Sequence, residues 1–178
     1  QIVKMCEAFS KLNNEVTLIT INESKSKINF INYYNIKSKF FLKRIKHFRS
    51  FPLGINYYLF SIFSIFESLR YKPEIYITRN FFTCFLLVIL RKNVVMELHH
   101  DLKIESRIVR FLVTKFKFLN SKCVKKIVAI THGVKEEYVK KDLIKKKNII
   151  VLPSGSSIRK NFEFSNNKKF FRIGYFGS

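Results

Sequence analysis

The amino-acid sequence predicts an α/β protein built on a Rossmann-like, doubly wound parallel sheet. Short apolar segments rich in β-branched residues alternate with longer segments of helical periodicity, which is the order of strands and helices in such folds. Most of the short segments are apolar almost without interruption, as expected of strands that are covered on both faces. The 178 residues, 47% of them hydrophobic, are enough for one domain with a sizeable core.

Each element is expected where the periodicity changes. The chain opens with a helical pattern, in which Ile2, Met5, Phe9 and Leu12 recur at helical spacing. The predicted helices cover about 1–13, 54–71, 81–91, 103–120 and 133–146. The predicted strands are EVTLITI (15–21), EIYITRN (74–80), NVVMELH (93–99), KIVAIT (126–131) and NIIVLP (148–153). No apolar segment reaches the roughly 18 residues that a membrane-spanning helix needs.

A change of composition after Ser157 predicts a domain boundary. Residues 1–157 form the predicted Rossmann-like domain, and the polar, turn-rich segment 158–169 is a predicted linker. FFRIGYFGS (170–178) follows as another buried strand, so 158–178 is expected to be the linker and first strand of a second domain. Because an uncovered strand at a terminus is prone to aggregation, we expect further sequence to follow it. By the same argument, a strand is expected before the opening helix.

The formal charge of +22 points to an anionic partner, either nucleic acid or a membrane surface. Few alanines, five glycines and three prolines, against many Lys, Asn, Ile and Phe residues, are typical of an A+T-rich genome. Part of the basicity is therefore compositional. No helix-turn-helix, zinc-finger or RNA-binding signature accompanies the charge, so we expect no specific nucleic-acid partner. A basic nucleic-acid-binding module remains the alternative from a different functional class.

The segment 37–50 (KSKFFLKRIKHFRS) concentrates the positive charge. It holds six Lys or Arg residues and no acid, interleaved with large apolar side chains. This pattern suits an anionic membrane interface, and it equally suits a solvated loop of a lysine-rich chain. Cys6, Cys84 and Cys123 are odd in number and far apart, which favours reduced core thiols. We expect a cytoplasmic protein, either free or held peripherally on the inner face of the cell membrane through 37–50.

Common catalytic and cofactor motifs are absent from the sequence. It contains no GxGxxG, GxxxxGK[ST], GxSxG or HExxH, so no dinucleotide fingerprint, P-loop, hydrolase elbow or metalloprotease helix is predicted. Polar and turn-forming residues instead follow four strands at their carboxyl ends, where ligands bind in parallel α/β sheets. These groups are Arg79-Asn80, His99-His100-Asp101, Thr131-His132-Gly133 and Pro153-Ser154-Gly155.

The stretch ELHHD (97–101) carries the most titratable chemistry. Side chains alternate along a strand, so Glu97 and His99 share one face and His100 points the other way. Adjacent histidines therefore make a weak metal site with Asp101. The structural interpretation has Asp101 capping the following helix, and the functional one has a histidine contacting a substrate at the cleft. A buried Glu97 needs a partner, and we expect His99 or a neighbouring lysine.

A second strand end, at Thr131, leads directly into a predicted helix. A helix start offers free N–H groups and a positive dipole end that suit an anion such as phosphate. The alternative is an ordinary capped helix with Gly133 as the cap and Glu136 in its first turn.

Taken in order, these motifs resemble the N-terminal half of a GT-B glycosyltransferase of the family 4 type. QIVKMCEAFSKLNNEVTLIT is similar to the family's first helix and second strand, and KPEIYITRN to the strand before the central helix. VVMELHHD is similar to the strand that ends in a histidine at the cleft. KKIVAITHGVKEEYVKK with NIIVLPSGSSI matches the following strands and helix, and FRIGYFGS is similar to the strand that opens the second domain.

The resemblance implies transfer of a sugar, with retention of configuration, from a nucleotide-sugar donor to a glycan or lipid-linked acceptor of cell-surface polysaccharide or lipopolysaccharide. It implies no cofactor beyond the nucleotide-sugar co-substrate and no protein-bound metal. The N-terminal domain supplies the acceptor side of the cleft, so the chain alone is expected to be inactive. The same fold also supports sugar-nucleotide epimerisation, which is the alternative chemistry.

The resemblance also implies roles for particular residues. His99, with His100 as its rival, approaches the reacting sugar, and Arg79, Asp101 and Thr131 line the cleft. Gly177 and Ser178 begin the loop at the donor phosphates, and Pro153 and Gly155 belong to the hinge. Three departures from the family pattern stand out: PSG replaces the usual PNG, the histidine is doubled, and the Gly-rich loop after the first strand is missing.

Overall fold

The computed structural model describes residues 2–22, 36, 40–46 and 52–153. Its strands are β1 (Thr17–Asn22), β2 (Phe41–Lys46), β3 (Tyr76–Thr78), β4 (Val94–Leu98), β5 (Val124–Ala129) and β6 (Ile149–Val151). Its α-helices are α1 (Ile2–Lys11), α3 (Leu53–Leu69), α4 (Phe81–Ile89), α5 (Arg107–Phe116) and α6 (His132–Lys140). Short 3₁₀ turns are η1 (Leu102–Ile104), η2 (Phe118–Asn120) and η3 (Lys146–Asn148).

Every strand that the structure describes pairs with its neighbour in parallel. β3, β4, β5 and β6 form one sheet in that order, and β1 pairs with β2 in a separate two-stranded sheet. Helices connect successive strands of the larger sheet, as parallel connections require. The predicted α/β class with parallel strands is confirmed, although the strands lie in two sheets where one was expected.

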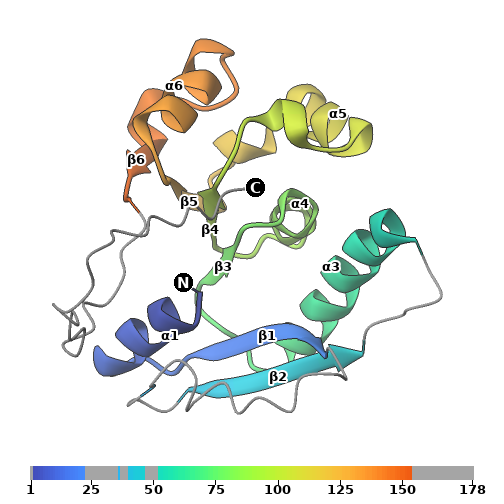
Figure 1. Ribbon diagram of the computed structural model, residues 1–178, viewed down its shortest axis with the longest axis vertical. Helices are drawn as coiled ribbons and strands as arrows, with labels where there is room; N and C mark the ends of the chain where they lie inside the picture. The colour runs from blue at the N-terminus through green and yellow to red at the C-terminus, as the bar shows by residue number, and fades with distance from the viewer. Residues whose placement is uncertain (1, 23–35, 37–39, 47–51, 154–178) are drawn as a thin grey trace, which may run out of the picture.

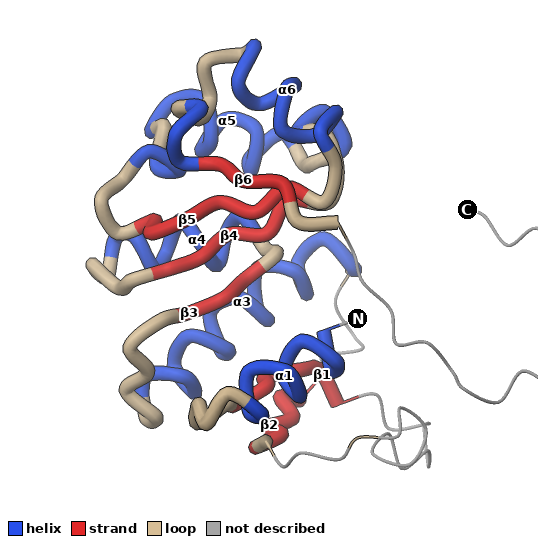
Figure 2. The backbone as a smooth tube through the Cα atoms, turned by 90° about the vertical axis from the view of Figure 1, so that its left-hand side faces the viewer, coloured by secondary structure: helices blue, strands red, loops and turns tan. Residues whose placement is uncertain are grey.

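The helix α3 ties the two sheets together. It contacts β1 and β2 of the smaller sheet and packs against α4, which covers β3 and β4 of the larger one. α3, α4 and α5 lie side by side to the right of the strands in Figure 1, whereas α1 lies on the opposite side against β1. Figure 2 shows the strands of both sheets from that opposite side, with α1 in front of β1. α6 packs against β5 and β6.

The core lies between the larger sheet and its helices, with β4 at its centre. Val94, Met96 and Leu98 are fully buried on β4, and Cys84 of α4 is equally inaccessible. Desolvation by burial raises the pKa of the Cys84 thiol to about 12. Burial of Cys6 and Cys84 agrees with the expectation of core thiols, whereas Cys123 is partly exposed.

Two local expectations were wrong. The segment 41–46, for which a solvated loop was one of the two interpretations, is the strand β2, and its backbone pairs with β1. The single helix expected at 103–120 is broken into η1, α5 and η2. Ser106 begins α5 by accepting a hydrogen bond from the Val109 N–H at 3.3 Å, and Lys117 ends it in the left-handed conformation. The predicted linker and strand at 158–178 lie outside the described residues.

Burial predicts which leucines of α4 hold the fold together. Leu87 is 1% exposed and Leu90, at the end of the same helix, is 46% exposed. We expect Leu87→Ala to lower the free energy of unfolding by about 2–5 kcal/mol, because it removes buried methyl groups and leaves a cavity. Leu90→Ala is the matched control and should change it by less than about 1 kcal/mol. Chemical denaturation measures both, and equal losses would contradict the assignment of the core.

Candidate functional site

A buried carboxylate at the end of β4 holds two basic side chains. Glu97 accepts hydrogen bonds from Arg79 Nε at 2.9 Å and from the terminal nitrogen Nη2 at 3.0 Å, so the ion pair is bidentate. The same carboxylate lies 3.0 Å from His99 Nε2 through its Oε1. His99 is the expected partner of Glu97, and Arg79 takes the place of the expected lysine.

This arrangement fixes how the His99 ring is protonated. A carboxylate can only accept, so Nε2 carries the hydrogen that it donates to Glu97. In the neutral ring, Nδ1 is then left as a hydrogen-bond acceptor. His99 is three-quarters buried, so its ring has one fixed edge on Glu97 and a limited exposed surface.

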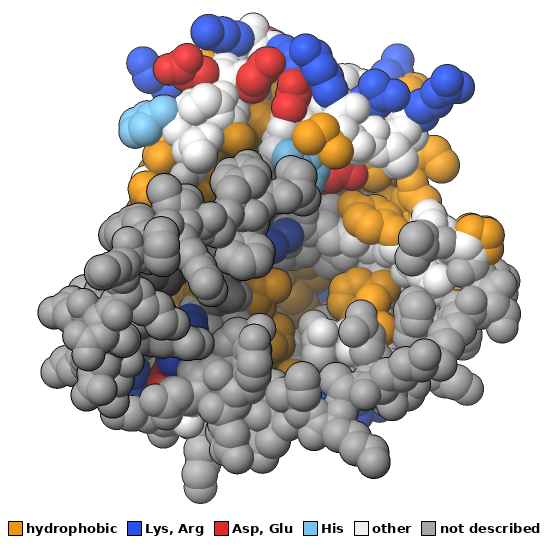
Figure 3. Space-filling view, in the orientation of Figure 1, with side chains coloured by type: hydrophobic (Ala, Val, Ile, Leu, Met, Phe, Trp, Pro, Cys, Tyr) orange, Lys and Arg blue, Asp and Glu red, His pale blue; other side chains and the backbone are white. Residues whose placement is uncertain are grey.

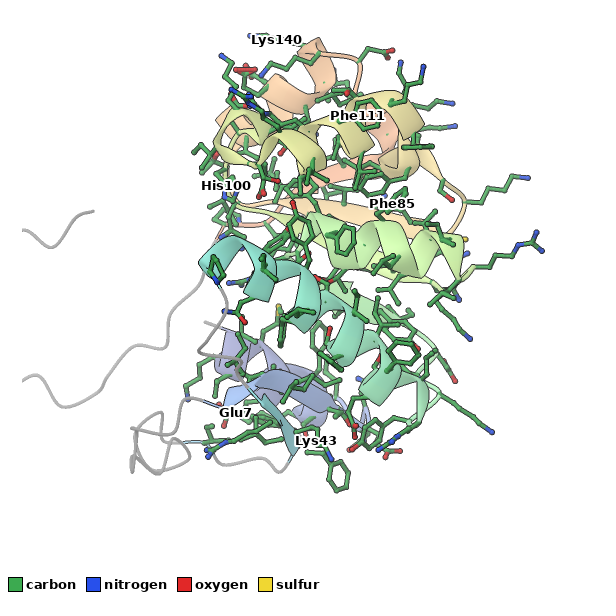
Figure 4. The ribbon with its side chains drawn as sticks, turned by 90° about the vertical axis from the view of Figure 1, so that its right-hand side faces the viewer. Glu7, Lys43, Phe85, His100, Phe111 and Lys140 are labelled. Carbon is green, nitrogen blue, oxygen red and sulfur yellow. The ribbon has the colours of Figure 1, made fainter. Side chains whose placement is uncertain are left out.

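The second histidine belongs to a different cluster. His100 Nε2 lies 2.8 Å from Glu105 Oε1, in the loop between η1 and α5. The backbone carbonyl of His100 accepts a hydrogen bond from the Tyr138 hydroxyl of α6 at 3.2 Å. Figure 4 shows His100 at the end of the sheet where β4 stops, beside the start of α3. Glu97 and His99 lie together, as the alternation along the strand predicted, and His100 has a different partner.

Glu105 was not singled out by the sequence motifs. Burial, and then the charge of Glu105, raise the pKa of both Tyr57 and Tyr138, so both hydroxyls remain protonated at neutral pH. Tyr58 is fixed nearby, since its hydroxyl lies 2.9 Å from the hydroxyl of Ser106. No sequence signal placed these tyrosines at the site, because the helices that carry them lie far from β4 along the chain.

Asp101 acts as a cap. Its carboxylate accepts from the Lys103 N–H at 3.2 Å at the start of η1, as the structural interpretation predicted, and from Lys141 Nζ at 3.0 and 3.3 Å. Desolvation acts to raise the pKa of Asp101, but the hydrogen bonds and charges of Lys141 and Lys103 outweigh it and lower the pKa. Lys and Arg side chains crowd the end of the molecule over α5 and α6, with acidic ones among them (Figure 3).

Thr131 caps α6, and Gly133 does not. The Thr131 hydroxyl accepts from the Val134 N–H at 3.2 Å, and the helix begins at His132. A Cβ added at Gly133 would meet nothing closer than 3.9 Å, so the structure does not require glycine there. Thr131 is exposed at the same edge as the histidines, while the expected role of Gly133 as the cap was wrong.

Of the residues predicted for the hinge and the donor site, the structure describes only Pro153. Pro153 follows β6 and is exposed at the carboxyl end of the larger sheet. Gly155, Gly177 and Ser178 lie outside the described residues. The structure therefore brings Arg79, Glu97 and His99 into one cluster and pairs His100 with Glu105 in a second. Asp101 pairs instead with Lys141 of the chain after α6.

Comparison of the sequence with protein-family models and with curated proteins found no match. Within residues 2–22, 40–46 and 52–153, no three His, Cys, Asp or Glu side chains are grouped to bind a metal ion together. None of the helices described is both long and apolar enough to cross a membrane.

The buried ion pair of Glu97 predicts that neutralising this carboxylate destabilises the fold more than neutralising an exposed one. Glu97→Gln keeps the size of the side chain but leaves the Arg79 charge without its partner in a partly desolvated place. We expect the free energy of unfolding to fall by about 1–3 kcal/mol. Glu137→Gln is the control, because it removes the 3.1 Å ion pair with Lys141 on the surface of α6, where a pair contributes less than about 1 kcal/mol. Equal losses in chemical denaturation would contradict the structural role of Glu97.

The lowered pKa of Asp101 predicts a pH dependence with a definite sign. A carboxyl whose folded pKa lies below its ordinary value of 3.8 stabilises the fold above that pH and loses this contribution as the pH falls. Asp101→Asn keeps a capping oxygen but removes the charge that faces Lys141. The wild-type protein should therefore be more stable than the variant near neutral pH, and the difference should shrink below about pH 4.

Denaturation at several pH values measures this difference. Glu74→Gln removes one carboxylate from an exposed position and controls for net charge. A difference between the wild type and Asp101→Asn that grows toward acid pH would contradict the prediction.

Proposed function

We propose that the chain is the acceptor-side domain of a retaining, nucleotide-sugar-dependent glycosyltransferase of the GT-B type. The observation that carries the proposal is the triad Arg79–Glu97–His99, which presents an oriented imidazole at the carboxyl end of a central parallel strand. Ligands of parallel α/β sheets bind at that edge. The motif order of the sequence supports the same assignment.

The triad suits recognition of a sugar more than covalent chemistry. With Nε2–H committed to Glu97, the neutral His99 ring offers Nδ1 as an acceptor for a sugar hydroxyl. Arg79 holds Glu97 with two nitrogens and so acts as a positioning residue for the histidine. An imidazole fixed in this way contributes by orienting the reacting sugar against the donor, which a flexible side chain could not do.

The residues around His100 suit the acceptor. Glu105, Tyr57 and Tyr58 place a carboxylate and aromatic surfaces beside the start of α3, and such surfaces pack against sugar rings. We assign the donor phosphates to the loop that contains Gly177 and Ser178, and closure to the hinge at Pro153 and Gly155. The reaction needs no cofactor besides the nucleotide-sugar, and we place it at the cytoplasmic face of the membrane.

The reaction itself is tested on the complete gene product. It is incubated with UDP- and GDP-sugars, with and without a membrane-lipid or glycan extract as acceptor, and free nucleoside diphosphate is measured. Release that requires the acceptor supports glycosyl transfer. A change of sugar configuration without an acceptor would identify an epimerase instead, and sequence-specific DNA binding that persists at physiological salt would overturn the enzyme assignment.

The two histidines are separated by paired variants of the complete gene product. We expect His99→Ala to lower kcat about 100-fold, because it removes the oriented hydrogen-bonding group. His100→Ala should lower kcat by no more than about 10-fold and act mainly on the KM for the acceptor. Steady-state kinetics with both substrates measures this difference. Wild-type activity in both variants would remove the histidines from the mechanism.

A further inference from the structure

The helix α3 carries small polar residues on its inner side. Ser61, Ser64 and Ser68 are all buried. Their hydroxyls donate to the carbonyls of Tyr57, Ser61 and Ile65 at 2.8, 3.0 and 2.8 Å, within the helix itself. A surface helix of a soluble domain normally turns its apolar stripe inward. Of the large apolar residues of α3, Ile65 lies with these serines on the side toward the protein and is 5% exposed.

Other large apolar residues of α3 point outward. Ile55, Ile62 and Phe66 are spaced by seven and four residues, which puts them on one side of the helix, and they are 45%, 36% and 67% exposed. We call these three residues the α3 face. No residue between Arg49 and Glu67 is charged, so no charged side chain interrupts the α3 face. An exposed apolar stripe of this kind marks an interaction surface.

Positive charge borders the α3 face. On the neighbouring strand β2, Phe41 is 63% exposed and shares a face of the strand with Lys43. The acid at the end of α3, Glu67, is neutralised by Lys43 at 3.1 Å and by Arg70 at 3.2 Å. Figure 4 shows Lys43 on β2, below α3.

From this combination we infer that the α3 face lies on an anionic lipid surface, with α3 parallel to the membrane plane. Exposed Ile and Phe side chains enter the boundary between headgroups and acyl chains, and Lys43 and Arg70 contact the anionic headgroups. With 17 residues, α3 is suited to lying in the interface rather than crossing it.

Charge complementarity favours lipid over other occupants. A second copy of this chain would bring two molecules of charge +22 together, which electrostatic repulsion opposes. Nucleic acid needs donors for its phosphates, and the side chains of the α3 face have none. The inference does not depend on the proposed sugar transfer, because lipid binding requires neither donor nor acceptor.

Vesicle flotation tests the surface directly. The full chain should float with vesicles of phosphatidylglycerol and phosphatidylcholine, and much less with phosphatidylcholine alone. The double variant Ile62→Ser, Phe66→Ser should bind the anionic vesicles at least about tenfold more weakly, because two apolar side chains no longer leave water. Leu152→Ser is the control, since Leu152 is 54% exposed just after β6, in the other sheet. Both variants change exposed residues, and chemical denaturation checks that each is folded.

A fluorescence measurement identifies the residue that meets the lipid. The chain contains no Trp, so a single introduced tryptophan reports only its own surroundings. The emission of Phe66→Trp should shift to shorter wavelength when anionic vesicles are added, and that of Leu152→Trp should not.

Three results would overturn the inference. They are flotation that the double variant leaves unchanged, an equal spectral shift at both tryptophans, and a dimer that Phe66→Ser converts to monomer without any change in flotation. The last result would make the α3 face a contact between copies. Loss of vesicle binding with sugar transfer intact, or the reverse, separates this inference from the proposed function.

Discussion

A carboxylate inside a central strand constrains everything around it. Glu97 lies among the fully buried side chains of β4, where an unpaired charge costs several kcal/mol. It is tolerated because Arg79 and His99 supply hydrogen bonds at 2.9 to 3.0 Å. Arg79 can do this only if β3 lies beside β4 in parallel register, and His99 only if the strand stays extended to its end. The pairing of β3 with β4 is thus required both by the sheet and by the ion pair of Glu97.

The class of fold and the strands were predictable because they depend on local pattern. Unbroken apolar segments mark strands covered on both faces, and that rule identified β4 and the neighbours that pair with it. The shared face of Glu97 and His99 followed from the alternation of side chains along a strand. What the pattern missed is β2, because its mixture of basic and apolar residues has no clear period of two and looks like a basic surface segment until its partner β1 is known.

Partners from distant segments were the part of the site that could not be predicted. Glu105 was one of 12 acidic residues, and nothing local distinguished it before its distance to His100 was known. Tyr57 and Tyr58 come from α3, more than forty residues before Ser106. Similarly, the apolar sequence of α3 predicted a helix but not its orientation, and the burial of its serines shows which side is turned inward. Composition tells how many apolar side chains a helix carries, but which of them face solvent is known only from the packed fold.

The bridging position of α3 has a structural consequence. The helix contacts both sheets, and the Tyr58 hydroxyl near its start bonds the Ser106 hydroxyl that caps α5. Ser106 follows Glu105, the carboxylate that orients His100. One hydrogen bond and the chain itself therefore link α3 to the loop that holds this histidine. The outer side of the helix and the strand edge with its histidine are thus joined by a short chain of contacts.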